Sequence, residues 1–242
     1  MEVKQYSEDA LTINLGSEVD EKINRQLVQL KSAVTALNLE GITDIVLSYT
    51  SLIIYFDVLK ADSKKISEAV KKLSLDELED REYAYKVVKI PVCYGGDFGP
   101  DLELFKENGL TPDDVIKMHS NTEYLVYMLG FMPGFPFLGG LSEKLFKARL
   151  DSPRTIIPAG SVGIGGRQTG MYPFDSPGGW NLLGRTPVPL YDSQREDAIL
   201  YEAGDRIIFT PVDEKEYKRI KESCAKGEYA VEVELRGEKD GA

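Results

Sequence analysis

Apolar residues recur along the first third of the chain in patterns that predict short strands and helices. Apolar positions at Leu11, Ile13 and Leu15 predict a strand, after which Ser17 is a candidate helix cap. Between residues 23 and 37 the apolar positions recur at steps of four and three, which predicts a helix with one buried face. The residues of that face are Ile23, Leu27, Leu30, Val34 and Leu37.

A hairpin and a second helix are predicted next. Residues 43–57 are rich in β-branched and aromatic side chains around a turn at 49–51, which is typical of a β-hairpin. Ser63 is a candidate cap for the second helix, and the acidic run at 75–82 favours a solvated helix end or a linker. The apolar face of that helix would consist of Ile66, Val70 and Leu73. The order strand, helix, strand, strand, helix, strand predicts an α+β domain over residues 1–84, with two helices on a small antiparallel sheet.

From residue 87 the pattern changes to one of strands with short helices between them. Residues 87–94 and 123–129 predict strands, and helices are expected at 101–109 and 111–119. The second of these is predicted to begin at Thr111, because a proline follows directly and an acidic residue comes three positions later.

Glycine and proline dominate residues 131–192, which hold 11 of the 22 glycines and 8 of the 12 prolines. This composition favours a barrel of short strands and tight turns over helices. A strand at 205–212 and a final helix starting near Asp213 complete the second domain, which we expect to span residues 85–242.

Composition and charge narrow the class of protein. Hydrophobic residues make up 42% and charged residues 29% of the chain, as in ordinary soluble globular proteins. The net charge of −11 disfavours binding to nucleic acid or to anionic lipid. Cys93 and Cys224 stand far apart, so neither a disulfide framework nor a metal site is indicated. The chain shows no leader pattern and no long apolar run, so we expect a cytoplasmic protein.

Residues 131–192 differ from the rest of the chain in charge as well. They hold six basic and four acidic residues, a net charge of +2, so the remainder carries −13. A basic, glycine-rich region can receive a small anion through fixed cations and exposed backbone N–H groups. Turns with scattered surface arginines would give the same composition.

Two single residues have both a functional and a structural interpretation. His119 is the one histidine of the chain, so a histidine-dependent proton transfer would have to use it, although lone histidines are often structural. Trp180, the one tryptophan, could line a concave wall or pack in the core. The glycines of residues 160–166 match neither a P-loop nor GxGxxG, so this chain binds ATP by neither route.

The run from His119 through GFMPGFPFLGGL (130–141) to PRTIIPAGSVGIGGRQTGMYPFDSPGGWNLLGRTP (153–187) resembles the allophanate hydrolase subunit 1 family. That family includes the B subunit of 5-oxoprolinase and the inhibitor of the sporulation histidine kinase. The resemblance is strong over residues 87–212. In the part of the chain before residue 87, only the layout of the elements is similar. The resemblance implies that the second domain is a cyclophilin-like β-barrel.

The resemblance also implies a function. The chain would be the B subunit of an ATP-dependent 5-oxoprolinase, inactive alone, that opens 5-oxo-L-proline to L-glutamate. Its partners would be a C subunit, which is a larger barrel homologue, and an A subunit. ATP with magnesium would be used in the assembled enzyme, where phosphorylation of the lactam oxygen makes the carbonyl carbon a better electrophile. Charge that develops on phosphoryl and carbonyl oxygens is best stabilised by fixed Arg and N–H donors in a dry pocket.

These expectations select eight candidate site residues. The candidate catalytic residues are His119, as proton carrier, Arg154 and Gln168. The candidate substrate-binding residues are Phe135, Arg167, Tyr172, Trp180 and Arg185. No metal ligands are expected.

Two other functions remain open at this point. The chain could inhibit a sensor histidine kinase, with an apolar patch of Phe131, Met132, Phe135 and Phe137 as its docking surface. The same patch would serve equally to dock the C subunit. Alternatively, the chain could be a carboxyltransferase or allophanate-hydrolase-related subunit that acts on a small amide.

Overall fold

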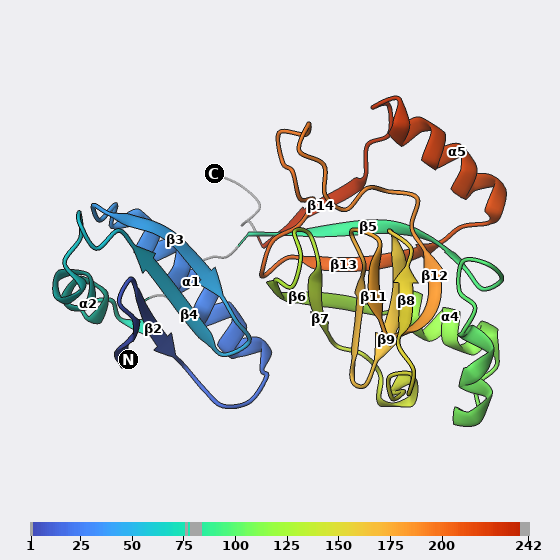
Figure 1. Cartoon of the computed structure of the whole chain (residues 1–242), viewed down its shortest axis with the longest axis horizontal. Coiled ribbons are helices and arrows are strands. Elements are labelled where there is room, and N and C mark those ends of the chain that lie inside the picture. The colour runs from blue at the N-terminus through green and yellow to red at the C-terminus, as the bar shows by residue number, and fades with distance from the viewer. Residues whose placement is uncertain (1, 76, 78–83, 238–242) are drawn as a thin grey trace. The chain divides into compact units, whose positions relative to one another are not determined.

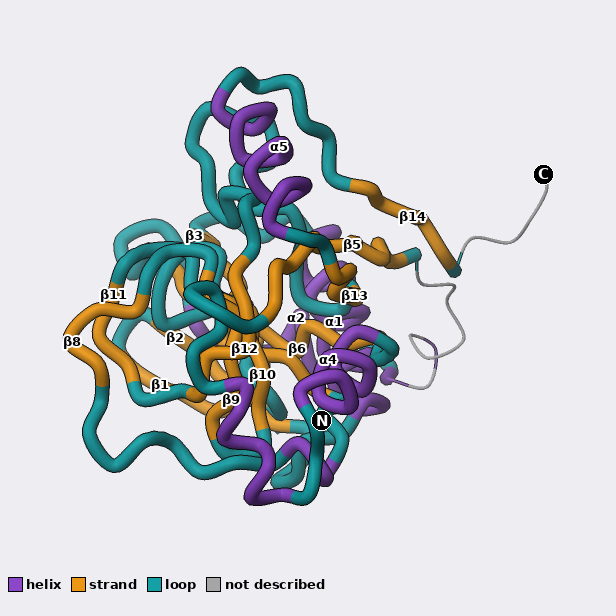
Figure 2. The backbone as a smooth tube through the Cα atoms, turned by 90° about the vertical axis from the view of Figure 1, so that its right-hand side faces the viewer, coloured by secondary structure: helices purple, strands orange, loops and turns teal. Residues whose placement is uncertain are grey.

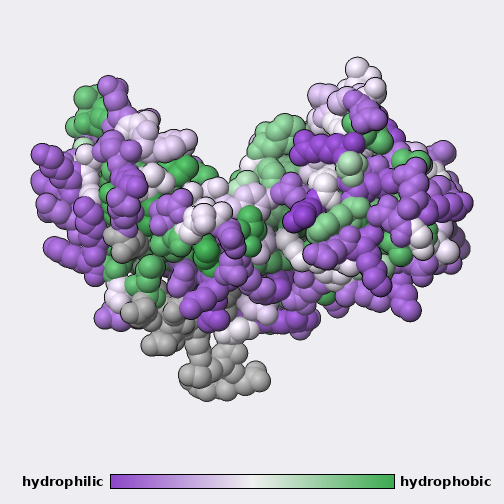
Figure 3. Space-filling model, turned by 90° about the horizontal axis from the view of Figure 1, so that it is seen from below, coloured by the Kyte–Doolittle hydropathy of each residue, from purple (hydrophilic) through white to green (hydrophobic). Residues whose placement is uncertain are grey.

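The computed structural model describes residues 2–75, 77 and 84–237, and the chain divides into two compact units (Figure 1). The boundary between the units lies between Ala84 and Tyr85. Hydrophilic residues predominate on the face seen in Figure 3, with apolar residues scattered among them. Within the described residues, no helix is long and apolar enough to cross a membrane.

The first unit is a four-stranded antiparallel sheet with the order β1-β2-β4-β3. Its elements are β1 (Val3–Ser7), β2 (Ala10–Asn14), α1 (Glu21–Ala36), β3 (Ile42–Leu47), β4 (Ser51–Phe56) and α2 (Ser63–Lys71). Leu11 pairs with Ile54 and Ile13 with Leu52, and all four side chains are buried, so one face of the sheet forms the core. Helix α1 packs on β3 and β4, and α2 on β1 and β2.

The predicted order of elements was wrong in this unit. The chain begins with a hairpin, β1–β2, and the strand that follows α2 is β5, which belongs to the second unit. The predicted hairpin at 43–57 is present as β3 and β4. The acidic run at 75–82 lies mostly outside the described residues.

The helix caps also differ from the prediction. Asp20 caps α1 by accepting hydrogen bonds from two backbone N–H groups, and Asp62 caps α2 from the position next to Ser63. A carboxylate also complements the positive end of the helix, which favours Asp over Ser at this position. Leu37 follows the last turn of α1 and is 37% exposed, so it does not belong to the buried face.

The second unit is a closed barrel of seven strands in the order β12-β9-β10-β7-β6-β13-β5, closed by pairing of β12 with β5. Its strands are β5 (Tyr85–Tyr94), β6 (Glu123–Leu129), β7 (Pro136–Gly139), β9 (Ser161–Gly165), β10 (Gln168–Met171), β12 (Asn181–Arg185) and β13 (Arg206–Pro211). Strand β13 runs parallel to β5, whereas the other neighbours are antiparallel. The predicted barrel of short strands is therefore confirmed.

Shorter elements surround the barrel. They are the 3-10 helices η1 (Leu102–Asn108) and η2 (Glu143–Leu145), the helices α4 (Pro112–Ser120) and α5 (Glu214–Ala225), and the strands β8 (Arg154–Ile157), β11 (Ser176–Gly178) and β14 (Glu232–Arg236). Thr111 and Asp114 form a capping box at the start of α4, and Asp213 caps α5, as predicted. Strands β8 and β11 pair with each other as a separate two-stranded ribbon (Figure 2).

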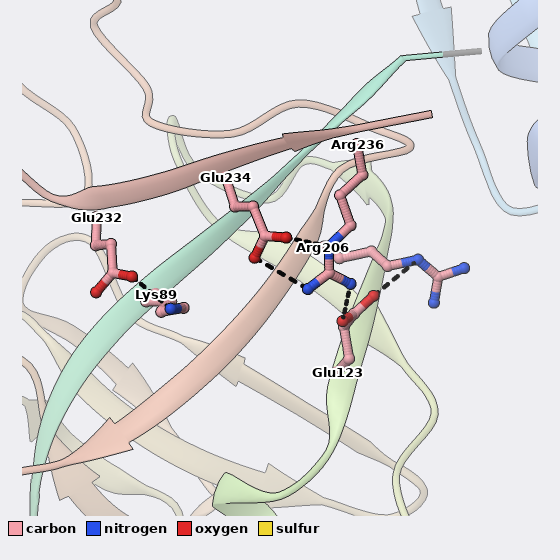
Figure 4. A network of polar contacts seen from close by, with 6 residues as sticks. All are labelled: Lys89, Glu123, Arg206, Glu232, Glu234 and Arg236. Carbon is pink, nitrogen blue, oxygen red and sulfur yellow. Dashed lines mark hydrogen bonds and ion pairs between the residues drawn. The ribbon is translucent and has the colours of Figure 1, made fainter. Parts of the chain in front are cut away.

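Strand β14 was not predicted, because its side chains are mostly exposed. It pairs with β5 outside the closed barrel and is held there by charged groups (Figure 4). Arg236 contacts Glu234 at 2.8 Å and Glu123 of β6 at 2.9 Å, and Arg206 of β13 lies 3.4 Å from the same Glu123. Lys89 of β5 also pairs with Glu232.

Candidate functional site

A cavity of about 240 Å³ lies between the barrel wall and the β8–β11 ribbon. It is lined by Phe131, Phe135, Phe137, Arg149, Tyr172, Pro177, Gly178, Gly179 and Trp180. Three of the five predicted substrate-binding residues, Phe135, Tyr172 and Trp180, come together here. The aromatic residues that sequence reasoning singled out are therefore neighbours in the fold.

Glycines of the barrel wall make room for the indole of Trp180. A Cβ atom at Gly165 would lie 2.3 Å from the indole ring, and one at Gly170 would lie 3.2 Å from it. A side chain at Gly165 would therefore displace the tryptophan. Edge-to-face contacts with Phe135 and Tyr172, with ring centroids 5.8 Å and 5.9 Å away, fix the indole further, so the apolar wall is formed before any ligand enters.

Phe131 lies at the mouth of the cavity in a strained backbone conformation. Its φ of 67° is in the left-handed region, and the Met132 N–H donates to the Gly130 carbonyl oxygen at 2.8 Å, which closes a γ-turn around Phe131. Phe131 as a whole is 71% exposed, and its ring touches that of Phe135 edge to face, with the centroids 5.5 Å apart. The turn therefore holds an aromatic ring in solvent beside the opening.

The polar groups of the cavity are a phenol and a guanidinium. Burial raises the pKa of Tyr172 to about 12, and the nearby positive charge of Arg149 opposes this shift only in part. The Tyr172 hydroxyl is therefore protonated at neutral pH and can donate a hydrogen bond. Arg149 was not among the predicted site residues, because it lies outside the motifs at 130–141 and 153–187 and no sequence spacing connects it to Trp180.

Arg154, a predicted catalytic residue, makes hydrogen bonds that hold the cavity wall in place. It donates to Asp101 at 2.6 Å and to the Trp180 carbonyl oxygen at 3.3 Å. Asp101 is only 5% exposed, and its second carboxylate oxygen accepts a hydrogen bond from the Leu182 N–H at 2.7 Å. The pair therefore ties β8 and the Trp180 segment to the start of η1.

The other predicted polar residues lie away from the aromatic cavity. The guanidinium of Arg167 lies 5.3 Å from the ring centre of Phe146, and that of Arg185 lies 5.9 Å from the ring centre of Phe98. Gln168 is partly buried at the start of β10. None of the three lines the cavity, so the structure does not bring them together with Tyr172 and Trp180.

His119 lies inside the barrel and is fully buried, stacked on Phe209 with ring centroids 4.6 Å apart. The Thr169 hydroxyl donates to the Gly163 carbonyl oxygen at 3.1 Å, so it accepts from His119 Nε2–H, at 2.8 Å. Nδ1 then accepts from the Tyr94 hydroxyl at 2.8 Å. Burial lowers the pKa of His119 to about 3, so the ring is neutral at pH 7. Both nitrogens are occupied, which argues against the predicted role as proton carrier.

A second, more open hollow of about 510 Å³ lies between the end of β5 and the start of α5. Its lining includes Asp97, Asp213 and Glu214, and no basic residue. Three carboxylates repel an anion, so the aromatic cavity with Arg149 is the better site for a small anionic molecule.

Comparisons with known proteins agree with the fold. Residues 1–201 match the family model "carboxyltransferase domain, subdomain C and D". The chain is 40% identical to the 5-oxoprolinase B subunit of Bacillus subtilis, over 91% of this chain and 97% of that protein. It is also 40% identical to the 5-oxoprolinase B subunit of Haemophilus influenzae, over 86% of this chain and 97% of that one.

Solved structures with this fold include chains much longer than this one. The crystal structure of TTHA0988 superposes with a TM-score of 0.77 at 36% identity, covering 84% of this chain but 40% of that one. The urea amidolyase of Kluyveromyces lactis has the same fold, with a TM-score of 0.75 at 22% identity over 97% of this chain and 16% of that one. The family model and the relatives thus agree: the chain belongs to the carboxyltransferase subdomain C and D family and, within it, to the family of 5-oxoprolinase B subunits.

Proposed function

We propose that this chain is the B subunit of an ATP-dependent 5-oxoprolinase, which opens 5-oxo-L-proline to L-glutamate together with an A and a C subunit. The observation that carries the proposal is the 40% identity to two 5-oxoprolinase B subunits over almost their whole length. We further propose that the chain works in the cytoplasm, that its barrel is of the cyclophilin-like type, and that it is inactive without its partners.

The aromatic cavity is where the lactam would bind. A small five-membered ring can pack against the aromatic wall that Phe135 and Trp180 form, and the protonated Tyr172 hydroxyl can donate to a carbonyl oxygen. A donor directed at this oxygen stabilises the negative charge that develops there when the amide is attacked. In this proposal the chain binds and orients the lactam.

ATP does not fit the aromatic cavity. The cavity of about 240 Å³ is smaller than the roughly 300–1,000 Å³ of sites for drug-sized ligands, and a nucleotide is at least as large as those ligands. Within the described residues, no group of three or more His, Cys, Asp or Glu side chains could hold a metal ion. We therefore assign no step of phosphoryl transfer to these residues and propose that ATP and magnesium bind elsewhere in the complex.

A partner protein would complete the site. Phe131 and Arg149 are exposed at the cavity, so a second protein surface could cover both. The chain spans 40% of the length of TTHA0988, so in that protein the same fold is continuous with a longer segment. A counterpart of that segment is what we propose as the C subunit.

The proposal is tested by mixing this chain with candidate A and C subunits, 5-oxo-L-proline, ATP and magnesium, and measuring glutamate with each component omitted in turn. We expect glutamate only when all three proteins and ATP are present. An assembled, folded mixture that forms none would overturn the substrate assignment.

Carboxyl transfer to a small amide is the second candidate function. The name of the matching family model and a 35% identity to a urea amidolyase over 52% of this chain favour it. The same mixture, supplied with urea and a carrier protein whose biotin has been carboxylated beforehand by a biotin carboxylase with ATP and bicarbonate, would distinguish the two functions by transfer of the carboxyl group from biotin to urea.

A further inference from the structure

We infer that Arg149 holds the carboxylate of a small ring-shaped anion whose ring occupies the aromatic cavity. This inference rests on the proposed function, because 5-oxo-L-proline is a small five-membered ring that carries one carboxylate. It adds the residue that would distinguish this anion from an uncharged lactam.

Arg149 differs from every other arginine of the second unit. Among the residues 85–236, all of which are described, it is the one arginine without an ion pair, hydrogen bond or aromatic ring contact. The others and their partners are Arg154 with Asp101, Arg167 with Phe146, Arg185 with Phe98, Arg195 with Ala198, Arg206 with Glu123, Arg219 with Glu216 and Arg236 with Glu234. The fork of N–H donors on Arg149 is therefore available to a carboxylate, which it matches in geometry.

The backbone places this free guanidinium beside the cavity. The Leu150 N–H donates to the Gly179 carbonyl oxygen at 2.7 Å, so the segment that carries Arg149 is fixed to one wall. A Cβ atom built on Gly179 would lie 3.7 Å from the Cβ of Arg149, which shows how closely the two pass. Arg149 and Gly179 both line the cavity.

The two ends of the cavity select two different groups of a ligand. Phe135, Tyr172 and Trp180 are each less than 5% exposed and offer the ring an apolar wall, whereas Arg149 is exposed and charged. A molecule with an apolar ring and one carboxylate would therefore bind with the ring inward and the carboxylate toward the opening. The size of the cavity restricts the ring to a small one.

Trp180 reports on binding directly, because it is the one tryptophan of the chain and lines the cavity. We would titrate the full chain, alone and mixed with its partner proteins, with 5-oxo-L-proline while recording tryptophan fluorescence with the partner signal subtracted. The same titration would use 2-pyrrolidinone, which has the lactam ring but no carboxylate. We expect saturable binding of 5-oxo-L-proline that is about 10- to 100-fold tighter than that of 2-pyrrolidinone.

Two variants separate the role of Arg149 from a general effect of charge. Arg149→Gln should weaken binding of 5-oxo-L-proline about 10- to 100-fold and leave 2-pyrrolidinone unchanged, and Arg149→Lys should restore part of the loss. Arg219→Gln is the matched control, because Arg219 is an exposed arginine on α5 that pairs with Glu216 and does not line the cavity, and this variant should bind 5-oxo-L-proline as tightly as the unaltered chain.

The outcomes distinguish this inference from the proposed function. If the complete enzyme forms glutamate while Arg149→Gln binds and turns over 5-oxo-L-proline normally, the inference is wrong and the function stands. If 5-oxo-L-proline binds in an Arg149-dependent way but no glutamate forms, the site stands and the reaction is wrong. Absence of saturable binding to the chain and to the assembled mixture would overturn the inference.

Discussion

At the scale of single residues, His119 illustrates how burial decides what a titratable group can do. With Nε2 donating to Thr169 and Nδ1 accepting from Tyr94, the ring has no free lone pair to take a proton from a substrate. The hydrogen bond to Thr169 also connects His119 to the cavity wall, because the next residue, Gly170, lies against the indole of Trp180. His119 therefore supports this wall from inside the barrel.

This structural role predicts how stability depends on pH. The pKa of His119 is about 3 when folded and 6.5 when unfolded, so below pH 6.5 the unfolded chain binds the extra proton. The stabilisation is present above pH 6.5 and is lost as the pH falls toward 3. Between pH 7 and pH 5, the unaltered chain should lose about 2 kcal/mol more of its free energy of unfolding than His119→Gln. Urea denaturation at both pH values measures this difference, and equal losses would contradict it.

Phe131 leads to a second prediction at this scale, since a left-handed backbone costs a non-glycine residue about 1–2 kcal/mol. Both Phe131→Gly and Phe131→Ala remove the ring, but only the alanine variant keeps the backbone strain. Phe131→Gly should therefore be about 1 kcal/mol more stable than Phe131→Ala. Thermal unfolding of the two variants measures the difference. Equal stability would mean that the turn is not strained.

At the scale of elements, the link between Asp101 and Arg154 shows how a separate ribbon is attached to the barrel. Asp101→Asn would leave the guanidinium of Arg154, whose side chain is 28% exposed, without its carboxylate. We expect a loss of about 2–3 kcal/mol in the free energy of unfolding, less than for a fully buried pair because of this exposure. Chemical denaturation measures it.

The control for this prediction is Glu103→Gln. Glu103 also pairs with a basic residue, Lys106, but both side chains are more than 60% exposed. That change should stay within about 0.5 kcal/mol. A similar loss in the two variants would show that the burial of the Asp101–Arg154 pair adds nothing to its contribution to stability.

Elements also show what the sequence could and could not predict. Thr111 and its capping box, strand β6 and the glycine-rich barrel were predictable, because their signals are local. Strand β14 was not, because its exposed residues are held by Glu123 and Lys89, both more than 100 positions away. In the site, Phe135 and Trp180 could be predicted because aromatic residues commonly line cavities. That Arg149 has no ion-pair partner among the described residues and that Arg154 pairs with Asp101 could not be predicted, because both depend on distances in the folded chain.

At the scale of the whole molecule, charge is distributed to suit a small anion. The chain as a whole carries −11, yet the segment 131–192, which supplies every residue of the aromatic cavity, carries +2. A local positive field attracts a small carboxylate, while the surrounding acidic surface repels polyanions such as nucleic acid.

The two units each have a core of their own, which leads to the last prediction. Every strand of the closed barrel lies between Tyr85 and Pro211, and β14 pairs with β5 alone. The main buried cluster of the barrel, from Val88 to Phe209, is likewise supplied entirely by this unit. A fragment of residues 85–242 should therefore fold without the first unit. We expect cooperative thermal unfolding and the same tryptophan emission maximum as in the full chain, because Trp180 keeps all its neighbours. A fragment that unfolds without cooperativity would show that the first unit is needed to form the barrel, whereas a folded one would show that the aromatic cavity is a property of the barrel itself.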